Sequence, residues 1–372
     1  MTQVPETPQP KGTRKATSTK AKRDTASSFK QEIKAELTRA DLKPNEVFKL
    51  IPEDWLEIAQ SEGGRYEIRS LIAHSFGLGI DQNLRLVAKN FPNARFRSAK
   101  NSDPGKMRSA ANCAATIARL VLRAMPQGRR ERTNSAPRPV PEAQELRQLL
   151  LEDGKPWIDL GVLADYCWSI DIPVLYLPNL PASGKMTGMV VRDKDQFAIV
   201  LSKKATNDIG SYQLFTLAHE LGHIACGHLT ADTPFLAEID QDRVRSNDSI
   251  HEEEKQANRY AEELLLGKSF IMKQPIDSAS LATIANEKSK QHKIDPGLIL
   301  LNLAKTSQEV LGANYWGLIT NAIKSLNNRP PHCQELLRSK LYDKINIDEL
   351  KLETWELLTR LKVLPTRTID ES

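Results

Sequence analysis

Residues 215–223 read Phe215-Thr216-Leu217-Ala218-His219-Glu220-Leu221-Gly222-His223. Apolar residues at helical spacing frame this stretch, and two histidines four residues apart lie on one face of a helix. Such a pair can hold one metal ion from two sides. Glu220 lies between them, where a carboxylate can take a proton from a water bound there. The stretch therefore predicts a metal-binding helix with hydrolytic chemistry, and the alternative is a pair of surface histidines without a metal.

A tetrahedral catalytic metal needs a third protein ligand and leaves its fourth position to water. The candidates after His223 are Cys226, His228, His251 and the carboxylates of Glu252, Glu253 and Glu254. The metzincin pattern H-E-x-x-H-x-x-G-x-x-H does not fit, because Gly227 and His228 follow His223 at four and five residues. Gly227 is therefore expected to end the helix. We expect His228, just past that end, to be satisfied by carbonyl groups or solvent, and Cys226 to be a small buried residue.

The segment from Glu254 to Leu265 predicts a second helix, since an apolar stripe recurs at helical spacing. The stripe consists of Ala257, Tyr260, Ala261, Leu264 and Leu265. Glu254 and Asn258 flank it on the buried side. The solvated face is expected to carry Glu252, Gln256, Arg259 and Glu263. A buried carboxylate without a partner is costly, so a metal gives Glu254 a reason to point inward. Asn258 would then accept the free ring N–H of His219 or His223 and fix its tautomer.

Alternatives remain for several of these roles. Glu253 is the second choice as third ligand, and all three glutamates at 252–254 also fit an acidic first helical turn favoured by the helix dipole. The sequence singles out no donor for the oxyanion of a hydrolytic reaction. The polar candidates for that role are Tyr212, His228, His251 and Arg243.

The two motifs together resemble those of the ImmA/IrrE family of zinc metallopeptidases. That family has the patterns F-T-x-A-H-E-[LIV]-G-H and E-x-x-A-[ND]-x-[FY]-A-x-x-L-L, and the resemblance covers about residues 142–305. It implies a metallo-endopeptidase with one Zn2+ held by His219, His223 and Glu254, and with Glu220 as the catalytic residue. It also implies a protein substrate, typically a transcriptional repressor or antitoxin cleaved under stress. Some substrate-side positions differ, since Tyr212-Gln213-Leu214 replaces a frequent arginine and Leu266-Gly267-Lys268 replaces a proline.

Composition shifts divide the chain into five predicted segments. These are a disordered basic tail (1–27), a helical N-terminal domain (28–125), a linker (126–141), a metallopeptidase domain (142–305) and a C-terminal helical region (306–372). Strands are predicted at 172–177, 186–191 and 197–201, directly before the metal helix. The predicted fold is therefore α+β and helix-rich, with a small antiparallel sheet packed on a zincin-like pair of metal helices, and helical regions on both sides of it in the chain.

The N-terminal domain carries a second, different signal. Predicted helices at 52–62, 66–76 and 82–89, with a glycine turn at Gly77 and Gly79, give a weak match to a helix-turn-helix unit. The segment 95–138 holds eleven basic and two acidic residues, so it is +9 while the rest of the chain sums to −4. Such a segment can hold nucleic acid or an acidic protein, and the alternative is a solvated helix face followed by a basic linker. The rival function is therefore a DNA- or protein-binding regulator with a non-catalytic zinc site.

The composition also bears on the compartment. No run of 18 or more apolar residues is present, and the N-terminus is polar and basic. Both features argue against a membrane span and a secretory signal. The four cysteines, at 113, 167, 226 and 333, form no CxxC pair, which is compatible with a reducing compartment. Cytoplasm is the expected location.

Overall fold

A computed structural model gives the fold of the 372-residue chain. It describes residues 15–91, 95–97, 104–125, 139–152, 154–184, 186–202, 210–230, 232–238, 248–271, 277–312, 314–326 and 332–365. The N-terminal part comprises α1 (Lys15–Arg39), α2 (Pro44–Phe48), α3 (Trp55–Ile58), α4 (Glu62–Phe76), β1 (Leu78–Ile80), β2 (Leu86–Ala88), β3 (Arg95–Arg97) and α5 (Pro104–Arg123).

The middle of the chain alternates helices and strands. It comprises α7 (Ala143–Leu151), α8 (Leu160–Ser169), β4 (Val174–Tyr176), β5 (Gly188–Asp193), β6 (Gln196–Leu201), α9 (Gly210–Ala225), β7 (Phe235–Glu238) and α10 (Asp248–Leu265). The remainder is helical: α11 (Ser278–His292), α12 (Pro296–Leu311), α13 (Trp316–Lys324), α14 (Cys333–Lys344), the 3-10 turn Ile347–Glu349 and α15 (Leu352–Arg360). The helix-rich α+β class is thus confirmed.

The main sheet has five strands in the order β3-β7-β5-β6-β4. The central strand β5 is antiparallel to both neighbours, β6 and β7, and its pairing with β6 is the predicted hairpin. Both edge strands run parallel to their neighbours, β3 to β7 and β4 to β6, so the sheet is mixed. The sequence prediction did not include β3 or β7, each of which is short and lies far from the hairpin in the chain.

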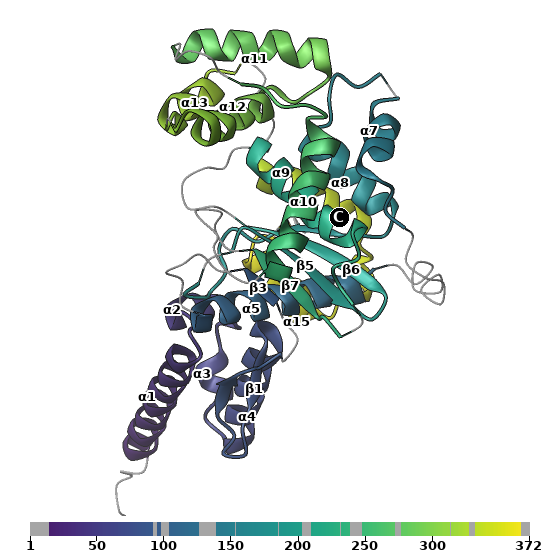
Figure 1. Ribbon diagram of the computed structural model, residues 1–372. Helices are drawn as coiled ribbons and strands as arrows, with labels where there is room; N and C mark the ends of the chain where they lie inside the picture. The colour runs from purple at the N-terminus through teal and green to yellow at the C-terminus, as the bar shows by residue number, and fades with distance from the viewer. Residues whose placement is uncertain are drawn as a thin grey trace, which may run out of the picture.

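Alternate residues of the central strands enter two different hydrophobic cores. Val190 and Ile199 face the core that holds α7–α13, whereas Met189 and Val200 face the core that holds α1, α4, α5 and α15. This period of two is the expected geometry of a strand buried on both faces. Figure 1 shows the result: α9 and α10 lie on one side of the sheet, and α5 and α15 lie on the other.

The predicted helix at 82–89 is wrong, and with it the helix-turn-helix unit. Gly77 ends α4 in the left-handed region (φ 72°), and the chain then forms the β1–β2 hairpin. Asp81 caps the hairpin turn rather than a helix, since its carboxylate accepts from the backbone N–H of Asn83 at 2.9 Å and of Arg85 at 2.8 Å. The predicted helix at 52–62 is also shorter than expected, because α3 covers only Trp55–Ile58 before α4 begins.

The predicted segment limits fall partly outside the described residues. Residues 1–14 of the expected tail and 126–138 of the expected linker are not described, and α1 begins at Lys15, inside the expected tail. Where both sides of the linker are described, they are not separate in space: α5 packs against β5 and β6, and β3 pairs with β7.

Candidate metal centre

The helix α9 carries the metal motif and is buried along most of its length. Leu214, Leu217 and Leu221 face the core that holds α7–α13, which we call the second core. The exposed fractions of His219, Glu220 and His223 are 0%, 1% and 2%. Charged or ionisable side chains are rarely buried to this degree unless they are paired or bind a metal. The inner face of α9 is therefore the part of the helix that could bind a metal.

Small residues let α10 approach α9 closely. A Cβ atom added to Gly222 would lie 3.0 Å from the carbonyl oxygen of Ala257 and 3.1 Å from the Cβ of Tyr260. Both distances are tighter than ordinary van der Waals contact. Gly222 and Ala257 thus set the spacing of the two helices. That spacing brings Glu254, one turn before Ala257, to the histidines of α9.

Three side chains converge at this contact. The Nε2 atoms of His219 and His223 are 3.1 Å apart, and the Glu254 carboxylate lies 3.3 Å from the first and 3.5 Å from the second. The ligand atoms of His219, His223 and Glu254 all lie within 4.8 Å of one another, and all three residues are buried. A buried group of this kind could hold a metal ion.

The outer hydrogen bond of His219 favours metal binding. Its Nδ1 lies 3.0 Å from Oδ1 of Asn258, one turn after Glu254. When that oxygen accepts the Nδ1–H, the Nε2 of His219 presents a lone pair to the centre of the group. The site then combines lone pairs with the Glu254 carboxylate, an arrangement that a bound cation stabilises.

The surroundings also favour the protonation states that metal ligands need. Burial alone would raise the pKa of Glu254, but hydrogen bonds from His219 and His223, and their charge when the rings are protonated, outweigh it and hold this pKa below its usual range. Burial lowers the pKa of His223, so its imidazole is neutral at neutral pH. Metals bind ionised carboxylates and neutral imidazoles, so both directions suit a metal centre.

Glu220 follows His219 in α9, and its carboxylate lies against strand β5. A Cβ atom added to Gly188 would lie 2.3 Å from Oε1 of Glu220 and 2.7 Å from Cγ2 of Thr216. A side chain at this position would therefore displace the Glu220 carboxylate from the place it occupies. Sequence reasoning did not single out Gly188, since a glycine at the start of a strand carries no signal of its own.

Other predicted candidates lie elsewhere. Glu253 is half-buried, and Cys226 is exposed, so the expectation that it is buried is wrong; neither residue belongs to the group. Tyr212 stacks on Trp316 with ring centroids 6.4 Å apart. Arg243 and the side chain of His251 lie outside the described residues.

Two residues near the site make contacts that the sequence did not predict, although Gln256 is exposed as expected. His228 is not a ligand but is buried, with its Nδ1 2.8 Å from the Nδ1 of His223. Gln256, expected only on the solvated face, lies with its Oε1 2.9 Å from the Nε2 of His228. Gly227 marked the helix end correctly, and the geometry of such an end could have placed His228 over the last turn of α9.

The basic segment has few described side chains, and they lie mainly around α5. Arg119 packs its guanidinium 5.3 Å from the ring centroid of Phe91, and burial lowers its pKa. Lys106, Arg108 and Arg123 are exposed. Because α5 packs on the sheet, its basic residues project from the edges of a core helix rather than from a free recognition helix.

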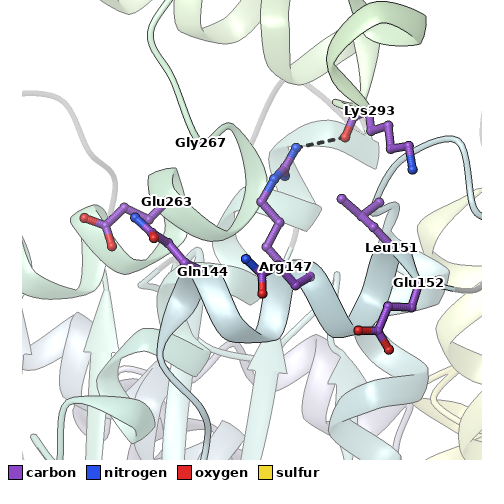
Figure 2. A pocket seen from close by; sticks show the side chains of 8 residues that line it. Gln144, Arg147, Leu151, Glu152, Glu263, Gly267 and Lys293 are labelled. Carbon is purple, nitrogen blue, oxygen red and sulfur yellow. Dashed lines mark hydrogen bonds between the residues drawn. The ribbon is translucent and has the colours of Figure 1, made fainter.

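A hollow in the surface lies apart from the metal group. Figure 2 shows Arg147 of α7 reaching toward Lys293 beside this hollow, which is also lined by Gln144, Glu152 and Glu263. The Arg147 guanidinium donates to the carbonyl oxygens of Leu264, Leu265, His292 and Lys293 at 2.9–3.2 Å. These carbonyl groups end α10 and α11, so Arg147 is a structural residue that joins two helix C-termini.

No protein-family profile matches this chain, and no curated protein matches it. The resemblance to the ImmA/IrrE family therefore stays a prediction that rests on the two motifs. Among the helices in the described ranges, none is long and apolar enough to cross a membrane.

Proposed function

We propose that this protein is a zinc-dependent endopeptidase that cleaves a protein substrate. One observation carries the proposal: the ligand atoms of His219, His223 and Glu254 converge within 4.8 Å, with the buried Glu220 between the two histidines in sequence. Two imidazoles and one carboxylate form a donor set typical of hydrolytic zinc sites. The resemblance to the ImmA/IrrE family implies that the substrate is a transcriptional repressor or antitoxin, and the composition favours the cytoplasm as the place of action.

Glu220 is the residue that moves protons in this proposal. A zinc ion at the site would act as a Lewis acid, which lowers the pKa of a nearby water and polarises the scissile carbonyl. The Glu220 carboxylate would take a proton from that water and deliver it to the nitrogen of the leaving amine. Because Gly188 has no side chain, it leaves the room that this carboxylate occupies.

The substrate approaches a sheet whose central strand is already paired. Gly188 of β5 pairs with Leu201 on one side and with Glu238 on the other. An extended peptide therefore cannot add to β5 itself. Recognition has to use side chains and loops around α9 and α10, or an edge strand of the sheet.

The test uses the full chain and the Glu220→Gln variant. Both should retain one zinc per chain, measured by elemental analysis, because Glu220 is not a ligand. A partner trapped by the variant should be shortened by the wild-type protein, at one site located by mass spectrometry. General base catalysis contributes about 10²–10⁴-fold, so the variant should cut slower by at least this range. Equal cleavage by both proteins would contradict the role of Glu220. Zinc binding without any cleavage would instead favour a binding regulator with a non-catalytic metal site.

A further inference from the structure

The C-terminal end of α9 places His228 against a proposed metal ligand. Gly227 adopts a left-handed conformation (φ 70°), its N–H donates to the carbonyl oxygen of Ile224, and the N–H of His228 donates to that of His223. This pair of hydrogen bonds is the Schellman motif, in which the residue after the glycine folds back over the last helical turn. An apolar contact usually forms at that point, but here two imidazole rings meet with centroids 5.0 Å apart.

The position of His228 is fixed from two further directions. Its side chain is 6% exposed, and the next residue, Leu229, is buried in the second core. The guanidinium of Arg192 in β5 donates to the carbonyl oxygen of Leu229 at 2.7 Å. The loop after α9 is therefore anchored to both the core and the sheet, and the His228 ring is held in place.

His223, His228 and Gln256 form a chain of two hydrogen bonds at 2.8 Å and 2.9 Å. For neutral rings this chain has two directions, because each imidazole carries one N–H and one lone pair. If Gln256 accepts from Nε2–H of His228, then Nδ1 of His228 accepts from Nδ1–H of His223, and Nε2 of His223 keeps its lone pair. In the opposite direction, Nε2 of His223 carries a hydrogen and cannot bind a metal.

We propose that His228 and Gln256 position the His223 imidazole in the tautomer that binds the metal ion. They act on His223 as Asn258 acts on His219, where an amide oxygen 3.0 Å away faces Nδ1. Each of the two histidines thus has its own hydrogen-bond partner outside the metal group. Asn258 of α10 contacts His219 directly, and Gln256 of α10 acts on His223 through His228. The inference rests on the proposed metal centre but not on peptidase activity.

The first test changes His228 in the full chain: one variant removes the acceptor atom Nδ1, and the other replaces it with an amide oxygen. The readout is the zinc dissociation constant, measured by competition with a chromophoric chelator. His228→Ala should weaken zinc binding about 10- to 100-fold, the usual effect of removing an outer hydrogen-bond partner of a ligand. His228→Asn places an amide oxygen near the position of Nδ1 and should recover most of the affinity. A merely structural role would not distinguish an acceptor from a small apolar residue in this way.

The second test sets the direction of the chain at the exposed Gln256. Gln256→Glu can only accept and should bind zinc at least as tightly as wild type. Gln256→Lys can only donate, favours the unproductive direction and should weaken zinc binding about tenfold or more. Arg259→Gln and Glu252→Gln change the charge of the same helix by the same amounts at exposed positions, so they measure the purely electrostatic part.

The outcomes separate this inference from the proposed function. Wild-type affinity in His228→Ala would overturn it, as would Gln256 variants that differ no more than their charge controls. If the His228→Ala variant shows no cooperative unfolding transition without metal, its zinc affinity is not interpretable. The comparison of Gln256→Glu with Gln256→Lys, both at an exposed position, then tests the inference. A wild-type protein that binds no zinc would overturn the metal centre itself, whereas zinc binding with these variant effects but no cleavage would overturn only the peptidase.

Discussion

At the scale of single residues, the spacing of residues in the sequence predicted the group of His219, His223 and Glu254. It also predicted Asn258 as a hydrogen-bond partner of one of the histidines. His219 and His223 are four residues apart on a helix, and Glu254 and Asn258 repeat that spacing on the next one. Helical periodicity alone brings such pairs to one face. Periodicity did not reveal His228 or Gln256, because their contact depends on how the chain turns after α9 and on the packing of α9 against α10.

Gly188 gives the sharpest prediction at this scale. Gly188→Ala adds a Cβ atom 2.3 Å from the Glu220 carboxylate and should displace it, while the three metal ligands stay in place. We expect zinc stoichiometry to be unchanged and cleavage of the trapped partner to fall about 100-fold or more, as for loss of a general base. The kinetics of cleavage at saturating zinc measure this effect.

The matched control is Gly63→Ala in the first turn of α4, where a Cβ atom meets nothing within 4 Å. It should leave cleavage unchanged and, because alanine favours helix, raise the unfolding free energy by up to about 1 kcal/mol. Wild-type cleavage by Gly188→Ala would contradict the placement of Glu220.

At the scale of elements, side chains from other helices hold or cap several helix ends. Arg147 holds the C-termini of α10 and α11 through four carbonyl hydrogen bonds. Arg147→Met keeps most of the apolar stem but removes the donors, and should lower the unfolding free energy by about 2–3 kcal/mol. Urea unfolding checks this value. Arg259→Met, at an exposed position of α10, should change it by less than about 0.5 kcal/mol, and an equal effect of both variants would rule out the bridging role.

Two N-cap aspartates should show opposite pH dependence. Asp295 caps α12 and accepts from Ser211 of α9 at 2.7 Å, and burial raises its pKa. The folded state then binds protons more tightly than the unfolded state, so stability falls as the pH rises through this pKa. Asp295→Asn removes that loss, and its stability relative to wild type should rise from about pH 4 to about pH 7.

Asp277 caps α11 at the surface and is the comparison. Hydrogen bonds from Ser280 and the backbone lower its pKa, so its contribution is present above the unfolded pKa and lost as the pH falls. Asp277→Asn should therefore be most destabilising near neutral pH and least so in acid. Thermal unfolding of both variants between about pH 2 and pH 7 measures the two slopes, with the Asp277 change expected below about pH 4 and the Asp295 change above it, and slopes of the same sign would refute the assignment.

At the scale of the whole molecule, the sheet joins segments that the sequence separates. The strands of the hairpin were predictable because two short apolar runs flank a charged turn at 192–195. The full sheet was not, because β3 and β7 have three and four residues and pair across more than a hundred positions. Periodicity is a local signal and carries no information on such pairings.

The shared sheet predicts that residues 142–305 do not fold alone. One face of β5 and β6, with Met189, Val191 and Val200, is covered by the core that includes α5 and α15. A fragment of residues 142–305 lacks both helices and should expose this face, bind a hydrophobic dye and lose cooperative unfolding. A fragment of residues 28–365 keeps both and should unfold like the full chain. Cooperative unfolding of the shorter fragment would mean that the sheet needs only one covered face.

The central claim is that His219, His223 and Glu254 hold one zinc ion. X-ray absorption at the zinc edge of the loaded full chain, with elemental analysis, tests it most directly. The expected result is one zinc per chain with two imidazole nitrogens at about 2.0–2.1 Å, oxygen ligands at about 2.0–2.2 Å and no sulfur. Glu254→Gln should lose the ion or an oxygen ligand, whereas Glu253→Gln should match wild type. A zinc–sulfur distance near about 2.3 Å, or no retained zinc, would contradict the account.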